Sequence, residues 1–193
     1  MKLIVGLGNP GRIYAGSRHN IGFTAIEALA QKNKISFRRD SKTSSLTGKG
    51  KIEGQDLALA MPLTFMNLSG KAVRALVHKY SIDLKDLLVV CDDLDLELGR
   101  VKIRPCGSSG GHRGLQSITE ALKSKEFARL RVGISRPQDK DADISGYVLC
   151  GFKPAQKRQI KGALKDAASC CQAWISGGIT KSMNIFNRRG VNK

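Results

Sequence analysis

The chain begins with a short apolar run, Leu3 to Leu7, that ends in a cluster of glycines and polar residues. An apolar run bounded by turn-forming residues is typical of a buried β-strand. In open α/β sheets, ligands bind beyond the carboxyl ends of the strands, so a site is expected just after Leu7. Asn9 and His19 follow that point and carry hydrogen-bonding and acid–base groups. The N-terminal segment therefore constrains both the fold and the position of its site.

Strand-like and helix-like segments alternate along the rest of the chain, which predicts an α/β fold. We expect a single domain, residues 1–193, with a mixed, mostly parallel, twisted sheet flanked by helices on both faces. The expected strands are 2–7, 57–61, 87–91, 101–103 and 130–134. The expected helices are 21–32, 70–80, 114–123, 154–176 and a short stretch after residue 180. Glycine and polar residues predict an edge hairpin over 36–54 and a polar loop over 136–145.

The chain is strongly basic, with 33 Lys and Arg against 16 Asp and Glu and a formal net charge of +17 at pH 7. Such an excess indicates a polyanionic partner, either nucleic acid or a membrane surface. Basic residues are dense in 151–193, where the expected helix has one apolar face and one lysine face. Membrane binding needs large apolar residues beside the basic face, and most of those here are small. Nucleic acid is therefore the favoured partner.

Five cysteines are present without a Cys-x-x-Cys spacing. This pattern argues against a disulfide framework and a structural zinc site, so we expect reduced packing residues. The N-terminal apolar run is too short for a signal peptide, and no later run approaches the length of a membrane span. The sequence therefore predicts a cytoplasmic protein.

Polar residues follow three of the expected strands: Asn9 and His19 the first, Asn67 the second and Asp92 the third. If these strands are parallel, the side chains share one edge of the sheet and can meet in one cleft. An imidazole, a carboxylate and two amides suit hydrolysis by activated water. The imidazole takes a proton, the carboxylate fixes its tautomer, and the amides hold the developing oxyanion. Such a mechanism needs no serine or cysteine nucleophile.

Other ligand-binding motifs in these segments are weaker. Gly6, Gly8 and Gly11 match the dinucleotide pattern Gly-x-Gly-x-x-Gly, but the residues that follow are a poor helix start for cradling a pyrophosphate. The acids within 92–97 could hold Mg²⁺, although their spacing is not that of a calcium loop and no Gly-Lys-Ser/Thr motif accompanies them. The Gly-rich loop 106–114 could bind phosphate through amides and nearby arginines, with a flexible turn as the alternative.

Six motifs occur in a fixed order along the chain, at 6–11, 18–22, 64–70, 92–95, 110–114 and 129–134. In that order and context, the sequence closely resembles bacterial peptidyl-tRNA hydrolases over almost its whole length. The resemblance implies a cytoplasmic monomer without metal, cofactor or obligatory protein partner. It also implies a carboxylic ester hydrolase that cleaves the bond between a peptide and the terminal ribose of tRNA, recycling stalled or dropped-off peptidyl-tRNA. A tRNA substrate would account for the positive charge.

The same resemblance assigns catalytic roles to matching positions. His19 would activate water, and Asp92 would orient the His19 ring. Asn67 and Asn9 would position the peptide carbonyl and stabilise the oxyanion.

Substrate contacts are also implied. The residues that would line the cleft near the tRNA 3′ end and the peptide are Tyr14, Phe65 and Met66. Arg104 and Arg131 match a basic pair that clamps the 5′-phosphate of tRNA, a role suited to guanidinium geometry. Further contacts along the acceptor arm would come from the lysine-rich C-terminal helix, Lys102 and Arg129.

One position departs from the family pattern, because Arg113 stands where the family typically has Asn after Gly-Gly-His. Asn donates and accepts hydrogen bonds, whereas Arg only donates and adds a fixed charge. Any contact in which that Asn accepts a bond from peptide or water would be lost. Arg113 could instead bind a phosphate or the substrate carbonyl, and a cation close to His19 would disfavour protonation of the imidazole. The sequence therefore does not determine how Arg113 changes the position of the peptide or the rate of ester cleavage.

A second hypothesis is a non-catalytic RNA-binding protein on the same fold, as in plant organelle splicing factors that resemble this family. The basic charge and Arg113 motivate it. The presence of His19, Asp92, Asn67 and Asn9 favours the enzyme, since RNA binding alone does not need them. Cleavage of the ester separates the two hypotheses.

Overall fold

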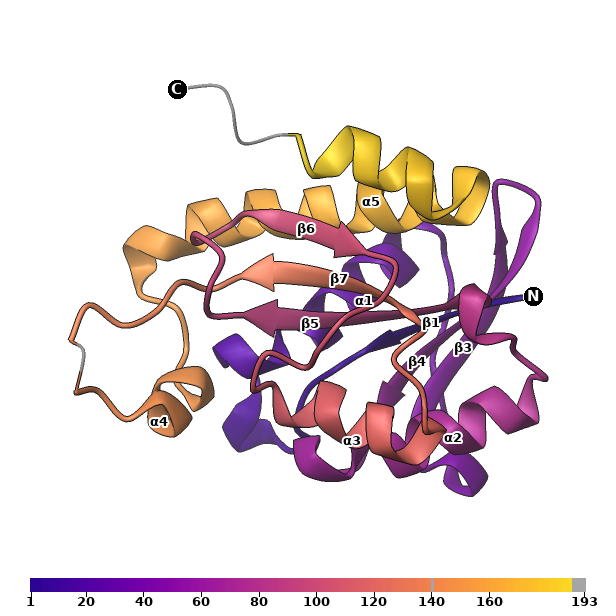
Figure 1. Ribbon diagram of the computed structural model, residues 1–193, viewed down its shortest axis with the longest axis horizontal. Helices are drawn as coiled ribbons and strands as arrows, with labels where there is room; N and C mark the ends of the chain where they lie inside the picture. The colour runs from indigo at the N-terminus through magenta and orange to yellow at the C-terminus, as the bar shows by residue number, and fades with distance from the viewer. Residues whose placement is uncertain (140, 189–193) are drawn as a thin grey trace.

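The computed structural model describes residues 1–139 and 141–188, and its centre is a seven-stranded sheet in the order β2-β3-β4-β1-β5-β7-β6 (Figure 1). The strands are β1 Lys2–Gly6, β2 Arg38–Asp40, β3 Ser45–Ile52, β4 Gln55–Pro62, β5 Leu87–Asp93, β6 Val101–Arg104 and β7 Ala128–Gly133. The central strands β4, β1, β5 and β7 are parallel, and the pairings towards both edges are antiparallel. The predicted α/β class and mixed sheet are confirmed.

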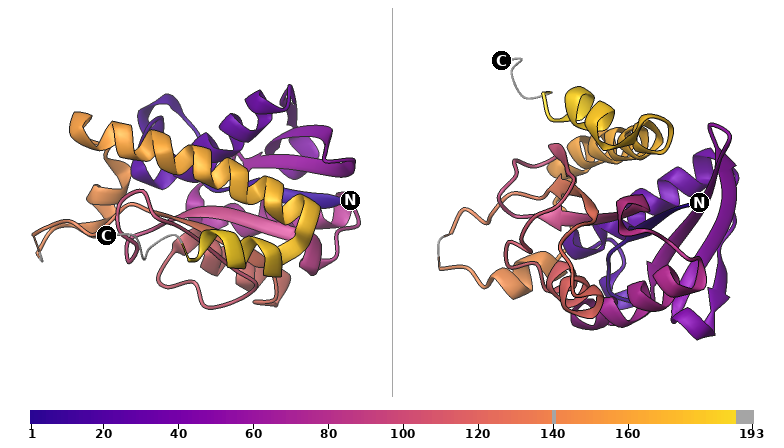
Figure 2. Two further views of the ribbon diagram at one scale, coloured as in Figure 1. Left: turned by 90° about the horizontal axis from the view of Figure 1, so that it is seen from above. Right: turned by 45° about the vertical axis from the view of Figure 1, so that its right-hand side comes forward.

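Helices cover both faces of the sheet, as predicted (Figures 1 and 2). The helices are α1 Ile21–Lys32, α2 Ser69–Lys79, α3 Arg113–Leu122, α4 Ile144–Leu149 and α5 Pro154–Phe186. Short 3₁₀ turns are η1 Arg12–Tyr14, η2 Arg18–Asn20, η3 Ser41–Thr43, η4 Met66–Leu68 and η5 Leu84–Asp86. Helix α5 is interrupted at Gly178, which has φ 72° and ψ −172°. This interruption confirms the expected division between a long helix and a short C-terminal one.

Two apolar layers lie on opposite faces of the sheet. On β1, Ile4 belongs to the layer beneath α1 and α5, whereas Leu3 and Val5 belong to the layer beneath α2 and α3. A strand buried on both faces reads as a continuous apolar run rather than an alternating one. The central strands could therefore be predicted from short runs of apolar residues in the sequence.

Two details differ from the sequence expectations, and one prediction about the edge of the sheet is confirmed. The last residues of the expected polar loop begin α4, whose first turn is capped by the Asp143 carboxylate, which accepts from the backbone N–H groups of Ser145 and Gly146. A six-residue helix offers too little periodicity to be read from sequence. The cysteines are free, but Cys106 and Cys150 are exposed rather than packed. The segment 36–54 does form the edge of the sheet, through β2 and β3.

None of the helices within 1–139 and 141–188 is long and apolar enough to cross a membrane.

The start of α1 lies very close to the ends of β1 and β5. A Cβ atom added at Gly22 would lie 2.5 Å from the backbone N and O of Leu7 and from the O of Val90. The Leu7 N–H donates to Val90 O, and the Phe23 N–H donates to Leu7 O. His19 lies just before this contact in the sequence. Because Gly22 has no side chain, α1 packs directly against the ends of β1 and β5 and brings His19 close to β5.

Replacement of Gly22 by Ala is therefore expected to destabilise the fold by about 1–3 kcal/mol, because the added methyl group overlaps backbone atoms that cannot move aside separately. The matched control is Gly162→Ala on α5, where a Cβ meets nothing within 4 Å. Alanine there favours the helix by about 0.5–1 kcal/mol. Thermal unfolding should show a lower Tm for Gly22→Ala and an equal or higher Tm for Gly162→Ala. Equal stability of Gly22→Ala and the wild type would contradict the packing argument.

Candidate active site

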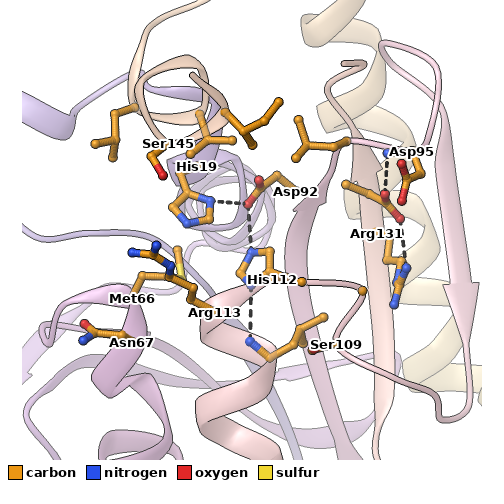
Figure 3. A pocket seen from close by; sticks show the side chains of 18 of the residues that line it. His19, Met66, Asn67, Asp92, Asp95, Ser109, His112, Arg113, Arg131 and Ser145 are labelled. Atoms are coloured by element: carbon orange, nitrogen blue, oxygen red, sulfur yellow. Dashed lines mark hydrogen bonds and ion pairs between the residues drawn. The ribbon is translucent and has the colours of Figure 1, made fainter. Parts of the chain in front are cut away.

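A cavity of about 560 Å³ lies beyond the carboxyl ends of the central strands (Figure 3). The polar segments that follow β1, β4 and β5 meet there because these three strands are adjacent and parallel. The sequence-predicted residues that line the cavity are Asn9, His19, Phe65, Met66, Asn67, Asp92, Arg113 and Arg131. The expected convergence at one edge of the sheet is therefore observed.

The centre of the site is the carboxylate of Asp92 at the end of β5, which is only 5% exposed. Its Oδ1 atom lies 2.8 Å from His19 Nδ1 and 3.0 Å from His112 Nε2. The two imidazole rings lie 4.9 Å apart between centroids, tilted by 43°. One carboxylate oxygen thus holds two histidines from different parts of the chain (Figure 3).

The hydrogen bonds determine which ring nitrogens carry protons. His112 Nδ1 accepts from the backbone N–H groups of Gly114 and Leu115, at 3.1 and 3.2 Å, so this nitrogen is unprotonated. The proton of His112 is then on Nε2 and is donated to Asp92. His19 likewise donates its Nδ1–H to Asp92, which leaves a lone pair on its Nε2. The ring edge of His19 opposite Asp92 faces the side of the cavity where Arg113 and Met66 lie (Figure 3).

The ionised form of Asp92 is favoured by its neighbours. Burial is the largest single influence on the pKa of Asp92 and would raise it. The electrostatic attraction and hydrogen bond of His112, followed by the hydrogen bond and electrostatic attraction of His19, act in the opposite direction and leave the pKa of Asp92 well below its ordinary value. Asp92 therefore remains an acceptor for both rings at neutral pH.

Asn9 is held with its amide oriented for donation into the cavity. Its Oδ1 accepts from the backbone N–H of Met66 at 2.8 Å. Asn20 fixes the Asn9 backbone on both sides, because its Oδ1 accepts from Asn9 N at 2.8 Å and its Nδ2 donates to Asn9 O at 2.9 Å. With Oδ1 occupied, the Nδ2 group of Asn9 is the part of the amide available to a ligand.

Asn67 and Arg113 bring exposed polar groups to the same side of the cavity. Asn67 stands in η4, just after β4, and Arg113 is the first residue of α3. In the described part of the chain, neither side chain has a hydrogen-bond partner, and Figure 3 shows both beside Met66. A ligand in the cavity would find two free sets of N–H donors there.

An apolar wall faces these donors. Ile144, Val148 and Leu149 of α4 line the cavity together with Phe65, and Phe65 is 55% exposed. Large exposed apolar side chains gathered at a cavity indicate a ligand with apolar groups of its own.

A basic surface adjoins the cavity on β6 and β7. The register pairs Lys102 with Arg131 and Arg104 with Arg129, so these four residues lie on one face of the sheet. Arg104 is exposed and Lys102 is half-buried. Arg131 donates to Asp93 Oδ2 at 3.1 Å and to Ser108 O at 3.0 Å, with part of its side chain still exposed.

Two expected substrate contacts are not where the sequence reasoning put them. Arg129 is fully buried, and its guanidinium donates to the carbonyl oxygens of Gly107, Ser108 and Lys125 at 2.6, 3.1 and 2.9 Å. Contrary to expectation, Arg129 is not on the basic surface, because its guanidinium is buried and holds the Gly-rich loop. Tyr14 is half-buried in η1 and is not among the residues that line the cavity.

Sequence reasoning missed His112 and Asn20. His112 lies inside one of the recognised motifs, directly before a predicted helix, which was a usable signal for a helix cap. Its bond to Asp92 depends on the packing of α3 beside β5 and left no local signal. Asn20 adjoins His19 in the sequence, but its pairing with Asn9 spans a turn whose shape the sequence does not specify.

The site contains two imidazoles and a carboxylate, which are side chains that can bind a metal ion. Potential ligand atoms of His19, Asp92 and His112 lie within 4.8 Å of one another. In the structure these atoms are joined by the hydrogen bonds just described. The neighbouring acids considered for Mg²⁺ are paired with arginines instead, Asp93 with Arg131 and Asp95 with Arg136.

Comparisons with known proteins agree with this geometry. The peptidyl-tRNA hydrolase family profile matches residues 3–193. A peptidyl-tRNA hydrolase of Syntrophomonas wolfei is 46% identical over 97% of this chain and 100% of its own length, and one of Bacillus cytotoxicus is 43% identical with the same coverage. The crystal structure of peptidyl-tRNA hydrolase from Acinetobacter baumannii superposes with a TM-score of 0.92 at 38% identity, covering 97% of this chain and 95% of that one.

A 5′-methylthioadenosine nucleosidase of Arabidopsis thaliana shares the fold alone, with a TM-score of 0.56 at 10% identity. The profile match and the relatives above cover nearly the whole chain and include the site. The chain belongs to the peptidyl-tRNA hydrolase family.

Proposed function

We propose that this chain hydrolyses the ester bond between the peptide and the terminal ribose of peptidyl-tRNA, with His19 as the base. The observation that carries the proposal is the single Asp92 oxygen that holds His19 with its Nε2 lone pair free, beside the amides of Asn9 and Asn67. Names of the relatives support the same reaction. The comparisons do not support the alternative of a non-catalytic RNA-binding protein.

In this mechanism His19 Nε2 removes a proton from water as the water oxygen attacks the ester carbonyl carbon. The ionised Asp92 stabilises the imidazolium that forms. The Nδ2 groups of Asn9 and Asn67 donate to the oxyanion of the tetrahedral intermediate. When the carbon–oxygen bond to the ribose breaks, His19 returns its proton to the departing ribose oxygen, so the imidazole is regenerated in each turnover.

The substrate is bound by three neighbouring surfaces. The wall formed by α4 and Phe65 takes the peptide, because both are apolar. Arg113 donates to a peptide carbonyl oxygen, since its guanidinium faces the cavity without a protein partner. Lys102, Arg104 and Arg131 bind the terminal phosphate of the acceptor arm, because they share one face of β6 and β7. Helix α5 covers the other face of these strands, and its exposed lysines offer the acceptor arm a second basic surface beyond the edge strand β6.

We further propose a cytoplasmic monomer formed by one domain, residues 1–193, that needs no cofactor. The substrate supports the location, since peptidyl-tRNA is formed where translation occurs.

Loss of the base or of its partner should abolish most of the activity. His19→Ala and Asp92→Asn are each expected to lower kcat by about 10²–10⁴-fold on N-blocked aminoacyl-tRNA, with KM nearly unchanged. Because neighbouring imidazoles depress the pKa of Asp92, the wild type should keep this carboxylate ionised even near the ordinary carboxyl value of about 3.9. Full turnover by His19→Ala would rule out the assigned base.

The basic surface should determine the salt dependence of tRNA binding. Replacing Arg104 by Gln is expected to reduce the slope of log K against log salt by about 0.7–0.9, the value for one lost phosphate contact. Arg38→Gln is a matched control, because Arg38 is also exposed but lies on β2 at the opposite edge of the sheet. Both variants lose one charge. Equal slopes for the two variants would remove the phosphate contact from Arg104.

Arg113 should act on substrate affinity rather than on the chemical step. Single-turnover assays of Arg113→Asn are expected to show an affinity for N-blocked aminoacyl-tRNA that is about fivefold weaker, because an exposed charge-assisted bond is worth about 1 kcal/mol. The rate at saturation should be unchanged, since Arg113 is assigned to binding the peptide and not to the proton transfer. A slower saturated rate with unchanged affinity would overturn this assignment.

A further inference from the structure

Arg18 is a buried arginine directly before the proposed base. It lies in η2 and is only 4% exposed. Burying a guanidinium is costly unless its donors are satisfied. Its Nη1 donates to the carbonyl oxygens of Gly151, Cys150 and Tyr147 at 2.7, 3.1 and 3.4 Å, and its Nη2 donates to Gln156 Oε1 at 3.2 Å. Its Nε is buried without a hydrogen-bond partner among the described residues. These acceptors are neutral, so the contact serves to hold backbone rather than to neutralise an acid.

The backbone that Arg18 holds is the end of α4 and the start of α5. A six-residue helix is marginal by itself, and its last carbonyl groups lack partners within the helix. The Arg18 guanidinium satisfies such carbonyls and places a positive charge at the helix C-terminus, where it is favourable. Gln156 Oε1 also accepts from the backbone N–H of Lys153, the N-cap of α5.

Further contacts join the same segments. The Arg18 backbone N–H donates to Cys150 O at 3.0 Å, and Ser17 forms a β-bridge with Gly151. The rings of Tyr147 and Phe152 lie over the guanidinium, 4.2 and 5.2 Å from its central carbon.

Helix α4 is also the apolar wall of the cavity, and it lies beyond the strand ends rather than on the sheet (Figure 1). The Tyr147 hydroxyl links α4 to Ile134, the residue after β7, by donating to Ile134 O at 3.0 Å. The contacts of Arg18 link α4 to the turn that carries His19. The Arg18 side chain therefore supplies four of the hydrogen bonds that hold the wall relative to the base, beside the backbone contacts and the Tyr147 hydroxyl.

Resting on the proposed function, we propose that Arg18 is a positioning residue that sets the spacing between the α4 wall and His19. In doing so, it determines the preference for a bulky apolar side chain on the amino acid esterified to tRNA. That amino acid lies nearest to His19, since its carbonyl carbon is the one attacked. Lysine cannot replace Arg18, because one ammonium group cannot reach four acceptors arranged around a planar fork.

The test compares N-acetyl-phenylalanyl and N-acetyl-glycyl esters of the same tRNA as substrates. For Arg18→Lys, kcat/KM on the phenylalanyl ester should fall about tenfold, mainly through KM, which corresponds to one lost charge-assisted bond. The fall on the glycyl ester should be less than about twofold, because glycine has no side chain to meet the wall. Arg38→Lys, at the exposed far edge of the sheet, is the matched control and should change neither value.

Hydrogen–deuterium exchange provides a readout that does not depend on activity. In Arg18→Lys, amides of 144–151 should exchange faster, while those of α1 keep wild-type rates. Should Arg18→Lys fail to fold, Gln156→Met removes one acceptor and should show the same effects more weakly.

The outcomes separate the two proposals. The ratio of kcat/KM on the phenylalanyl ester to kcat/KM on the glycyl ester is the deciding value. If this ratio is the same in the variants as in the wild type, the role of Arg18 is overturned and the proposed function stands. Cleavage of neither ester by the wild type would overturn the proposed function itself.

Discussion

The site depends on one buried oxygen atom, Oδ1 of Asp92, which accepts a hydrogen bond from each of two histidines. A carboxylate that is 5% exposed is stable only if donors replace the water it has lost. One donor comes from the turn before α1, and the other comes from the cap of α3. The end of β5 must therefore meet the starts of two helices on opposite faces of the sheet. Close packing at Gly22 holds the start of α1 against β5, and the capping bonds of His112 hold its ring at the start of α3.

Much of this arrangement could be predicted because it follows from strand order and apolar composition. Residues that end parallel neighbouring strands must share an edge, so Asn9, Asn67 and Asp92 could be placed together without coordinates. The partners of these residues could not be placed. His112 and Asn20 act through the exact position of a helix start and a turn, which depend on tertiary packing rather than on local pattern.

The burial of individual arginines could not be predicted from the sequence. A net charge of +17 correctly suggested a polyanionic partner, but it did not distinguish arginines that face solvent from those that hold the fold. Arg129 and Arg18 are buried and donate to neutral oxygens, mainly backbone carbonyls. Arg104 and Arg113 are exposed. Neighbouring positions on the same strand pair thus have different environments, because Gly107 and Ser108 of the Gly-rich loop accept from Arg129, whereas Arg104 is exposed.

Asp92 and the amides of α3 hold the two histidines in opposite tautomers. Long-range ¹H–¹⁵N correlation spectra of imidazole-labelled protein, recorded at a pH where both rings are neutral, test this arrangement directly. We expect a protonated Nδ1 and an unprotonated Nε2 for His19, with the reverse for His112. A proton on Nε2 of neutral His19, or on Nδ1 of neutral His112, would contradict it.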